Sequence, residues 1–494
     1  MTGPASAPPR ESRSGLDAWA VDELPPPRAT RGIGLLGVIG PGAIILGVSI
    51  GSGEWLLGPA AFVRHGLSLL WVTLVAAFLQ TVFNTELMRY TLYTGEPAFT
   101  GFMRTRPRST FWAVFYAALT FLQVGWPGWA GAAAGAIFYL GAGRLAGPDD
   151  ANAVYWIGAA AFGACVLVLL FGRRIERTLE ILNWILIVCI LGGLTALCVA
   201  FAKLPAWGAA AAGFAGFDAA SGRFDFFPAG ADWFLIGAFA AYSGAGGVIN
   251  LILANWARDK GFGMGAKVGF IPAAVGGKRV ALGHTGRVFV PNAESLPRWR
   301  AWWRIVAIDQ WGVFFAGALL GMALPAVLYV SFLPPGRDIR GLAVAAELAN
   351  AMAARGGPAL AFAVALMGAW VLFKTQLDIL EGLTRAITDI LWTGSRRIRN
   401  WRGGDVRVVY YSVLGAAVVF GLVALRQAQP ILLLQLGANA AGIVFVVSSL
   451  HILRVNTTLL PESLRPPLWR RAALVAMALF YGFFVALWLW SAVR

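Results

Sequence analysis

Charged residues are scarce in this chain. Asp, Glu, Lys and Arg make up 13% of its 494 residues and 58% are hydrophobic, with a mean hydropathy of +0.69. Soluble domains carry about 25% charged residues, so this composition excludes the soluble globular class. The formal net charge of +16 does not indicate nucleic acid, because the basic residues collect in short loops between apolar runs.

Cysteine and histidine are also rare. Both types lie scattered along the chain without the spacing of a metal site: Cys165, Cys189, Cys198, His65, His284 and His451. We interpret the cysteines as small hydrophobic residues, and the histidines argue against a zinc centre or His-based catalysis. The chain has no nucleophile–base pair and no cofactor-binding loop, so we expect neither an enzyme nor a bound cofactor.

Long apolar runs fill most of the sequence. Residues 1–31 are rich in Pro, Ser, Ala and Arg, lack the apolar core of a signal peptide, and predict a disordered cytoplasmic tail. Judged against about 20 residues per span, eleven later segments are long enough to cross a membrane: 33–63, 67–93, 110–141, 153–171, 178–202, 231–256, 303–333, 359–392, 407–426, 429–453 and 469–492.

Basic residues alternate between the loops that join these segments. The pattern predicts an integral protein of a bacterial cytoplasmic membrane with its N-terminus inside and its C-terminus outside. The lipid bilayer is then its main partner, and the oligomeric state stays open. The one large insertion is cytoplasmic, at 257–303, where 278–282 and 287–290 predict a hairpin around a glycine turn. We interpret it as a solvated insertion, with a gate or partner site as the alternative.

Glycine interrupts the first apolar segment near its middle. Gly51, Ser52 and Gly53 are followed directly by Glu54. Because glycine holds a helix poorly and unpaired backbone cannot face lipid, we expect an interrupted helix that faces protein or a water-filled cavity. Secondary transporters build solute sites in this way. Gly244 to Gly247 in the sixth segment predict a second interruption, with close helix packing as the alternative.

Several motifs, in this order, resemble the Nramp family of divalent-metal transporters: Gly40-Pro41-Gly42, Leu70-Trp71-Val72 running to Gln80-Thr81, Thr94-Gly95-Glu96, Leu433-Leu434-Gln435-Leu436, and the last loop with Pro461-Glu462 and Pro466. The resemblance covers nearly the whole chain. It implies an all-α membrane protein with a LeuT-type fold, in which about 11 helices form a 5+5 inverted repeat plus one extra helix, and helices 1 and 6 are broken. The repeats would be 32–202 and 203–453, followed by a loop and the last span at 454–494.

The expected site differs from the family pattern. The family has Asp-Pro-Gly-Asn in the first break and Met-Pro-His in the sixth span, whereas this chain has Gly51-Ser52-Gly53-Glu54 and, from Ser243 to Asn250, neither methionine nor histidine. The acidic relay of the third span has no counterpart within 123–129. Gln435 matches the family's tenth-span glutamine. The resemblance therefore implies the fold rather than soft-metal selectivity or the usual proton coupling.

The residues at the two interruptions offer only oxygen ligands. Glu54, Asn250 and Gln435 are the candidate metal ligands, and the binding set also includes Gly51, Ser52, Gly53, Gly244 and Gly247. Hard cations such as Mg²⁺, Mn²⁺ and Ca²⁺ prefer such donors. A charge at mid-membrane costs roughly 2.5–3.5 kcal/mol on insertion scales, so we expect Glu54 to face a cavity. The alternative is that Glu54 pairs with Lys374 or Arg64 and seals the pathway.

The eighth segment carries four charges on one helical face, at Lys374, Asp378, Glu381 and Arg385. We interpret Glu381 and Arg385 as an internal ion pair. Lys374 and Asp378 lie deeper. The eighth span of LeuT-type carriers packs against the first, so the resemblance makes Lys374 a candidate substitute for a coupling cation and Asp378 a candidate proton carrier. Asp309 in the seventh segment is expected to pair with Arg304 at the membrane interface.

Three functions remain open. The first is a secondary transporter of a hard divalent cation. The second is a carrier of a small organic solute such as an amino acid, whose carboxylate the glycine break would hold. The third is a non-transporting scaffold or sensor that keeps only the fold and works through the 257–303 insertion.

Overall fold

The computed structural model describes residues 14–28, 32–171, 175–275, 282–339, 344–427 and 429–493. It is 77% helical. In these ranges nine helical stretches are long and apolar enough to cross a membrane: Pro41–His65 (α1, η2 and α2), Leu67–Thr94 (η3 and α3), Pro148–Leu170 (η4 and α7), Ile175–Phe201 (α8), Ser295–Phe332 (α12, η6 and α13), Glu347–Gly394 (α14), Val406–Ala424 (α16), Pro430–Thr458 (α17) and Leu468–Val493 (α18).

Two further spans are split into shorter helices. The segment predicted at 110–141 consists of α5 (Ser109–Val124) and α6 (Gly128–Ala142), and the one predicted at 231–256 consists of α10 (Trp233–Tyr242) and α11 (Val248–Lys260). With these pairs, every predicted segment has a helical counterpart. The seventh begins at Ser295 rather than at residue 303, so the end of the predicted insertion is helical. The predicted all-α membrane architecture is confirmed.

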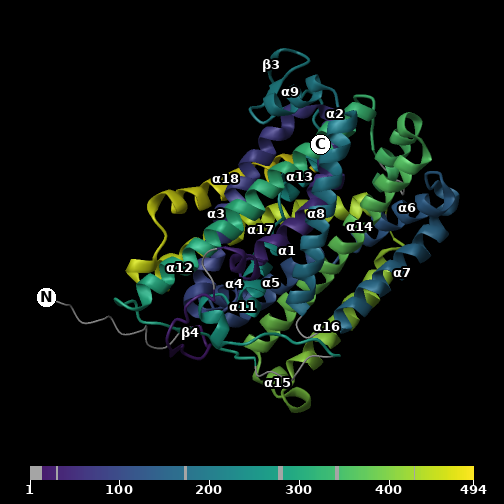
Figure 1. The fold of residues 1–494 in the computed structure, drawn as a ribbon. Coiled ribbons are helices and arrows are strands. Elements are labelled where there is room, and N and C mark those ends of the chain that lie inside the picture. The colour runs from purple at the N-terminus through teal and green to yellow at the C-terminus, as the bar shows by residue number, and fades with distance from the viewer. Residues whose placement is uncertain are drawn as a thin grey trace.

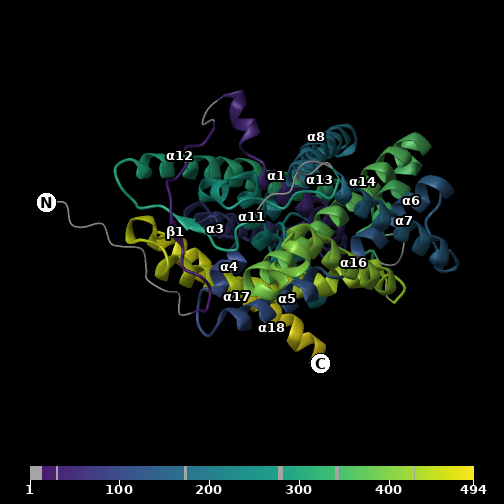
Figure 2. The ribbon, with the colours of Figure 1, turned by 90° about the horizontal axis from the view of Figure 1, so that it is seen from below.

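The first span lies in the middle of the bundle (Figure 1). Every residue of α1 (Pro41–Ser49) is buried, and α1 packs against α8, α11 and α14. On one side α14 packs against α6, α7 and α16, while α17 packs against α10 and α18. The view from below shows α12 and α16 on opposite sides of the central helices (Figure 2).

The two ends of the bundle differ. At one end, which we name the α9 end, lie α9 (Leu204–Gly213) and a short hairpin of β2 (Phe217–Asp218) and β3 (Arg223–Phe224). At the other, the α15 end, lie α15 (Arg396–Arg399) and β4 (Arg287–Val288), as Figure 1 shows.

Part of the predicted tail is ordered at the α15 end. We name residues 14–28 the N-terminal strap. Its strand β1 (Ala20–Val21) pairs in parallel with β4, and Leu24 is buried. The prediction of a disordered tail is therefore wrong for 14–28, because composition alone does not reveal docking partners far along the chain. The predicted hairpin is not formed by 287–288, whose partner is β1, and 276–281 lie outside the described residues.

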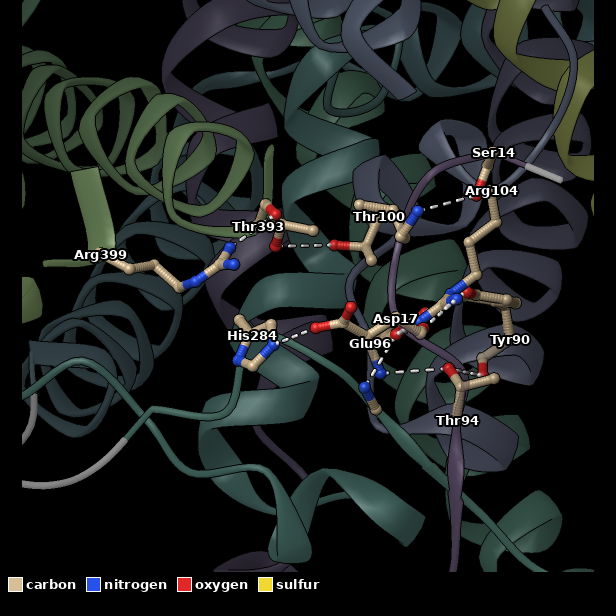
Figure 3. A network of polar contacts seen from close by, with 12 residues as sticks. Ser14, Asp17, Tyr90, Thr94, Glu96, Thr100, Arg104, His284, Thr393 and Arg399 are labelled. Atoms are coloured by element: carbon tan, nitrogen blue, oxygen red, sulfur yellow. Dashed lines mark hydrogen bonds and ion pairs between the residues drawn. The ribbon is translucent and has the colours of Figure 1, made fainter. Parts of the chain in front are cut away.

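A buried carboxylate organises the loop beneath the strap (Figure 3). Glu96 follows α3 and accepts hydrogen bonds from Arg104 Nε at 2.7 Å, from the Gly286 N–H at 2.8 Å and from the Tyr90 hydroxyl. Burial by itself raises the pKa of Glu96, but the Arg104 guanidinium and these donors hold that pKa below its usual range. This carboxylate thus ties α3, α4 (Ala98–Met103) and the insertion together.

We expect Glu96→Gln to lower the free energy of unfolding by about 3–5 kcal/mol, because Arg104 then stays buried without its counter-ion. Since the folded pKa is depressed, the stabilisation is present above the unfolded pKa and disappears as pH falls through the folded one. Thermal unfolding in detergent between pH 7 and pH 3 measures both effects. The exposed Glu462→Gln is the control; equal unfolding temperatures for the two variants at pH 7 contradict the expectation.

Candidate functional site

The first interruption keeps the chain helical. Residues Ile50–Leu57 (η2) form a π-helix, and the Gly58 N–H donates to the carbonyl of Gly53, five residues earlier. The interruption is where the glycines predicted it, but its form is a widened helix rather than an unwound stretch. A π-helix pairs each N–H with a carbonyl five residues back, so no backbone group faces lipid unpaired.

Glu54 lies inside this widened turn. Ser49, five residues earlier, donates its hydroxyl to Oε1, while Oε2 has no hydrogen-bond partner among the described residues. The side chain is 1% exposed and lies beside Gly321 of α13 (Ala316–Phe332). Neither predicted alternative partner reaches it, because Lys374 pairs with Asp378 and Arg64 pairs with Asp232 at 2.6 Å.

The second interruption breaks its helix completely, as predicted. Between α10 and α11 the φ angles of Gly244, Gly246 and Gly247 are +113°, +90° and +55°, a region that side chains other than hydrogen disfavour. The bend therefore depends on these glycines.

Two glutamines from other spans satisfy the broken backbone. Gln80 of α3 donates to the carbonyl of Ser243 and accepts from the Ala245 N–H, both at 2.9 Å. Gln123 of α5 donates to Gly246 O and accepts from Val248 N, both at 2.8 Å. Sequence reasoning missed this role. The signal was available, because each is an uncharged polar side chain with two hydrogen-bonding ends inside a membrane span.

The two interruptions touch. A Cβ atom added at Gly53 would lie 1.8 Å from the carbonyl oxygen of Tyr242, the last residue of α10. Trp129 of α6 donates to the Ser52 hydroxyl at 3.1 Å, and its ring lies 6.0 Å from that of Tyr242. Spans 1, 3 and 6 thus meet at Ser52 and Gly53.

The three predicted metal ligands do not share one point. Asn250 Nδ2 donates to Asn84 at 2.8 Å and to Gln80 at 3.2 Å, which leaves its Oδ1 without a partner in the described ranges. Gln435 instead lines a pocket of about 290 Å³ next to Arg64. No hydrogen bond joins Glu54, Asn250 and Gln435 in the described part of the chain. There, too, no three Asp, Glu, His or Cys side chains gather as a metal site.

The charged stripe of α14 divides into two pairs. Lys374 forms a salt bridge with Asp378. Asn183 Nδ2 also donates to the two carboxylate oxygens of Asp378, at 3.3 and 3.5 Å. Arg385 forms a salt bridge with Glu381, as predicted, and a second one with Asp259 of α11. The inner pair lies near α1 as well, since Thr375 next to it donates to the carbonyl of Gly47 at 3.4 Å.

Asp309 does not pair with Arg304. It lies fully buried in the π-helix η6 (Ile308–Phe315) and accepts from the N–H groups of Gly40 at 2.8 Å and Gly42 at 2.7 Å. The carboxylate therefore binds the orphan donors at the N-terminus of α1, where the helix dipole also favours negative charge. The predicted local pair was wrong because the real partners lie far away in the sequence.

Comparisons with known proteins identify the fold. No protein-family model and no curated protein sequence matches the chain. Among solved structures, the manganese transporter of Eremococcus coleocola, in complex with an aromatic bis-isothiourea compound, has a TM-score of 0.61 at 16% identity and covers 96% of this chain and 90% of its own. A histidine-to-alanine variant of that transporter has a TM-score of 0.64 at 15% sequence identity, with the same coverage of both chains.

A different transporter is similar over an even larger share of this chain. Mhp1, a nucleobase-cation-symport-1 family transporter in a closed conformation with bromovinylhydantoin bound, gives a TM-score of 0.54 at 13% identity and covers 98% of this chain and 94% of its own. The chain thus has the fold of these transporters. The predicted LeuT-type architecture is confirmed at the level of the fold.

We expect Gly53→Ala to disrupt the contact between the two interruptions, because its methyl group would overlap the Tyr242 carbonyl. Overpacking of this kind costs typically 1–3 kcal/mol. Thermal unfolding of the purified variant measures the loss. Gly163→Ala in α7 is the matched control, since nothing lies within 4 Å of its added Cβ; a Gly53→Ala protein as stable as this control would contradict the packing.

Proposed function

We propose that the chain is a secondary transporter that moves a hard divalent cation, Mg²⁺, Mn²⁺ or Ca²⁺, by alternating access, with Glu54 as its ligand. The observation that carries the proposal is a fully buried carboxylate, placed where the two interrupted spans meet, whose Oε2 has no protein partner among the described residues. A buried carboxylate oxygen without a donor binds a cation or a proton.

The donors around Glu54 favour a hard ion. Ser49, which donates to Glu54, and Ser52, two residues before it, offer oxygen groups, and no three Cys, His, Asp or Glu side chains gather as a metal site in the described ranges. Mg²⁺ keeps several of its waters and takes only one or two carboxylates, which suits a site with a single Glu. We propose that Asn250 and Gln435 approach Glu54 in another state of the transport cycle.

The buried pair on α14 is our candidate for coupling. Lys374 and Asp378 are both fully buried between α8 and α1, where an ammonium group can take the place of a bound coupling cation and Asp378 can accept a proton. The support is positional, because Thr375 joins this helix to the carbonyl of Gly47, one turn before the π-helix. Protonation of Asp378 would release Lys374 and change how α14 meets α1.

The proposed orientation places the α15 end in the cytoplasm. Basic residues of the predicted inside loops gather there, on α15 and around β4. The strap then lies in the cytoplasm and α9 outside.

A small organic solute is the second candidate. Trp129 and Tyr242 flank Ser52 where the interruptions meet, and aromatic walls of this kind suit a planar or apolar solute. In that case Glu54 would receive a proton or a substrate ammonium group rather than a metal ion.

We expect Glu54→Gln to abolish saturable binding of hard cations, because an amide oxygen replaces the charged ligand. Isothermal titration of the purified protein with Mg²⁺, Mn²⁺, Ca²⁺ and Zn²⁺ is the measurement, with Glu462→Gln as the control that removes one exposed carboxylate. Binding that survives in Glu54→Gln would exclude Glu54 as the ligand. If the unaltered protein binds none of the four ions but binds amino acids or nucleobases, the organic-solute candidate replaces the cation proposal. If it binds neither class, the non-transporting scaffold or sensor is the function that remains.

We expect Asp378→Asn to remove the pH dependence of cation uptake into proteoliposomes, because the amide cannot take up the proton. Uptake measured between pH 5.5 and pH 8 at equal membrane potential tests this. Glu381→Gln changes a carboxylate one turn away on the same helix and is expected to keep the pH profile. An unchanged profile in Asp378→Asn would assign the coupling elsewhere.

A further inference from the structure

The N-terminal strap is fixed to the α15 end at three successive places. At the first, the His284 ring bonds the Asp17 carboxylate at 2.8 Å and Arg104 donates to the carbonyl of Asp17 at 3.0 Å (Figure 3). The ring of Trp19 lies 4.7 Å below the Arg104 guanidinium. The strap is thereby connected to the same Arg104 that neutralises Glu96.

The second place is the strand pair. Ala20 and Val21 are the parallel partners of Arg287 and Val288. Asp22, next to them, accepts from Arg287 at 2.8 Å and from Lys267 at 3.1 Å. The neighbouring Glu23 N–H and these two cations lower the pKa of Asp22 to about 2, so the pairs stay charged at every physiological pH.

The third place joins the strap to the seventh span. The carbonyl of Leu24 accepts from Arg298 at 3.0 Å, and that of Pro25 accepts from the Trp302 indole at 2.8 Å. Leu24 itself is buried. Both donors belong to α12 (Ser295–Ala307), the helix that continues into the π-helix with Asp309.

The strap also forms one wall of a cavity at this end. The cavity has a volume of about 930 Å³ and is lined by Pro25 and Pro26 of the strap, by Gly37 and Val38 just before α1, and by residues at the start of α8 and the end of α11. Its charged lining residues are Arg28, Glu176, Arg177, Glu180, Arg258, Asp259 and Lys260. The cavity therefore lies where α1, α8 and α11 converge.

The start of α1 is held closed against this cavity. Lys260, at the end of α11, donates to the carbonyl of Ile39 at 2.9 Å and to Glu180 of α8 at 2.6 Å. A Cβ atom at Gly40 would lie 2.4 Å from Lys260 Nζ. Lys260 thus packs against Gly40, where any side chain would displace it, and the first span continues from there through α1 into η2, which holds Glu54.

We infer that the N-terminal strap is a clasp, which holds the start of α1 against α8 and α11 and must detach before the 930 Å³ cavity opens toward Glu54. The inference rests on the proposed alternating access only in assuming that α1 moves. Pro25 and Pro26 of the strap line the cavity together with Gly37 and Val38 just before α1, so the attachments to α12, β4 and Arg104 fix this wall of the cavity beside the start of α1.

The attachments suit reversible release. The strand pair has two residues in each strand, and the cations that bind Asp22 are partly exposed at 37% and 49%. Exposed ion pairs contribute little stability each and are screened by salt. The strand pair is therefore the attachment at which the strap separates most readily from the body.

A disulfide between strap and body tests the clasp. Ala20 and Arg287 are direct strand partners, so Ala20→Cys with Arg287→Cys can form a cross-link in the native register after the three native cysteines are replaced. Thr375→Cys reports opening, because Thr375 is fully buried between α14 and α1. Its labelling by a small thiol reagent is measured in membranes with the strap oxidised or reduced.

We expect oxidation to slow labelling of Thr375→Cys at least tenfold and a reductant to restore it. The same protein with Ala20→Cys alone, and with Arg287→Cys alone, controls for the oxidant and for the lost Asp22 contact. In the opposite direction, Asp22→Asn with Leu24→Ser should speed labelling several-fold. Equal labelling rates in the oxidised and reduced states overturn the clasp, as do unchanged rates in the loosened variant when its unfolding temperature is normal.

The same proteins separate this inference from the proposed cargo. Mn²⁺ and Mg²⁺ uptake into proteoliposomes should fall with the cross-link in place and recover on reduction. If labelling responds to the cross-link but neither ion is taken up in any state, the clasp stands and the cation proposal fails. If uptake occurs and is insensitive to the cross-link, the cation proposal stands and the clasp fails.

Discussion

Every feature of the candidate site depends on one constraint: backbone groups that leave the α-helical pattern inside a membrane need other partners. The chain meets it in two ways. At Gly51–Gly53 the hydrogen bonds shift to five-residue spacing and the helix widens. Between α10 and α11 the helix ends, and Gln80 and Gln123 bond the exposed carbonyls and N–H groups. The site is therefore the product of spans 1, 2, 3 and 6 together, and span 2, which supplies Gln80, is a continuous helix in this region.

The architecture was predictable from the sequence because it follows from local quantities. Apolar length predicts where the spans lie, so each predicted segment overlaps a described helix, although the seventh and eighth spans begin at Ser295 and Glu347, earlier than predicted. The break at Gly244–Gly247 was also predictable, since three positive φ angles need glycine. The π-helical form of the first interruption was not, because a π-turn and an unwound turn use the same residue types and the choice depends on packing against α13 and α10.

The contacts that sequence reasoning placed wrongly are long-range ones. Asp309 has Arg304 nearby in sequence, yet it binds the backbone of Gly40 and Gly42, more than 260 residues away. Residues 14–28 have the composition of a disordered segment, yet their partners lie on α12, β4 and at the end of α4. Glu54 was expected to face a cavity, and the structure buries it beside Ser49 and Gly321. Gln435 lines a pocket beside Arg64, and which residues of α17 face that pocket depends on the rotation of the helix, which no local pattern specifies.

The two π-helices, Ile50–Leu57 and Ile308–Phe315, lie in neighbouring spans, with η6 packed against α1 and η2 packed against α13. In each of them a hydrogen bond joins residues that are five apart, so it encloses one residue more than the four-residue bond of an α-helix. If such a segment returned to α-helical bonding, the residues beyond it would rotate by about 100° and shift by about 1.5 Å. A change of the first span from π-helical to α-helical hydrogen bonding would therefore turn Glu54 toward a different neighbour, and every backbone N–H and carbonyl would keep a partner.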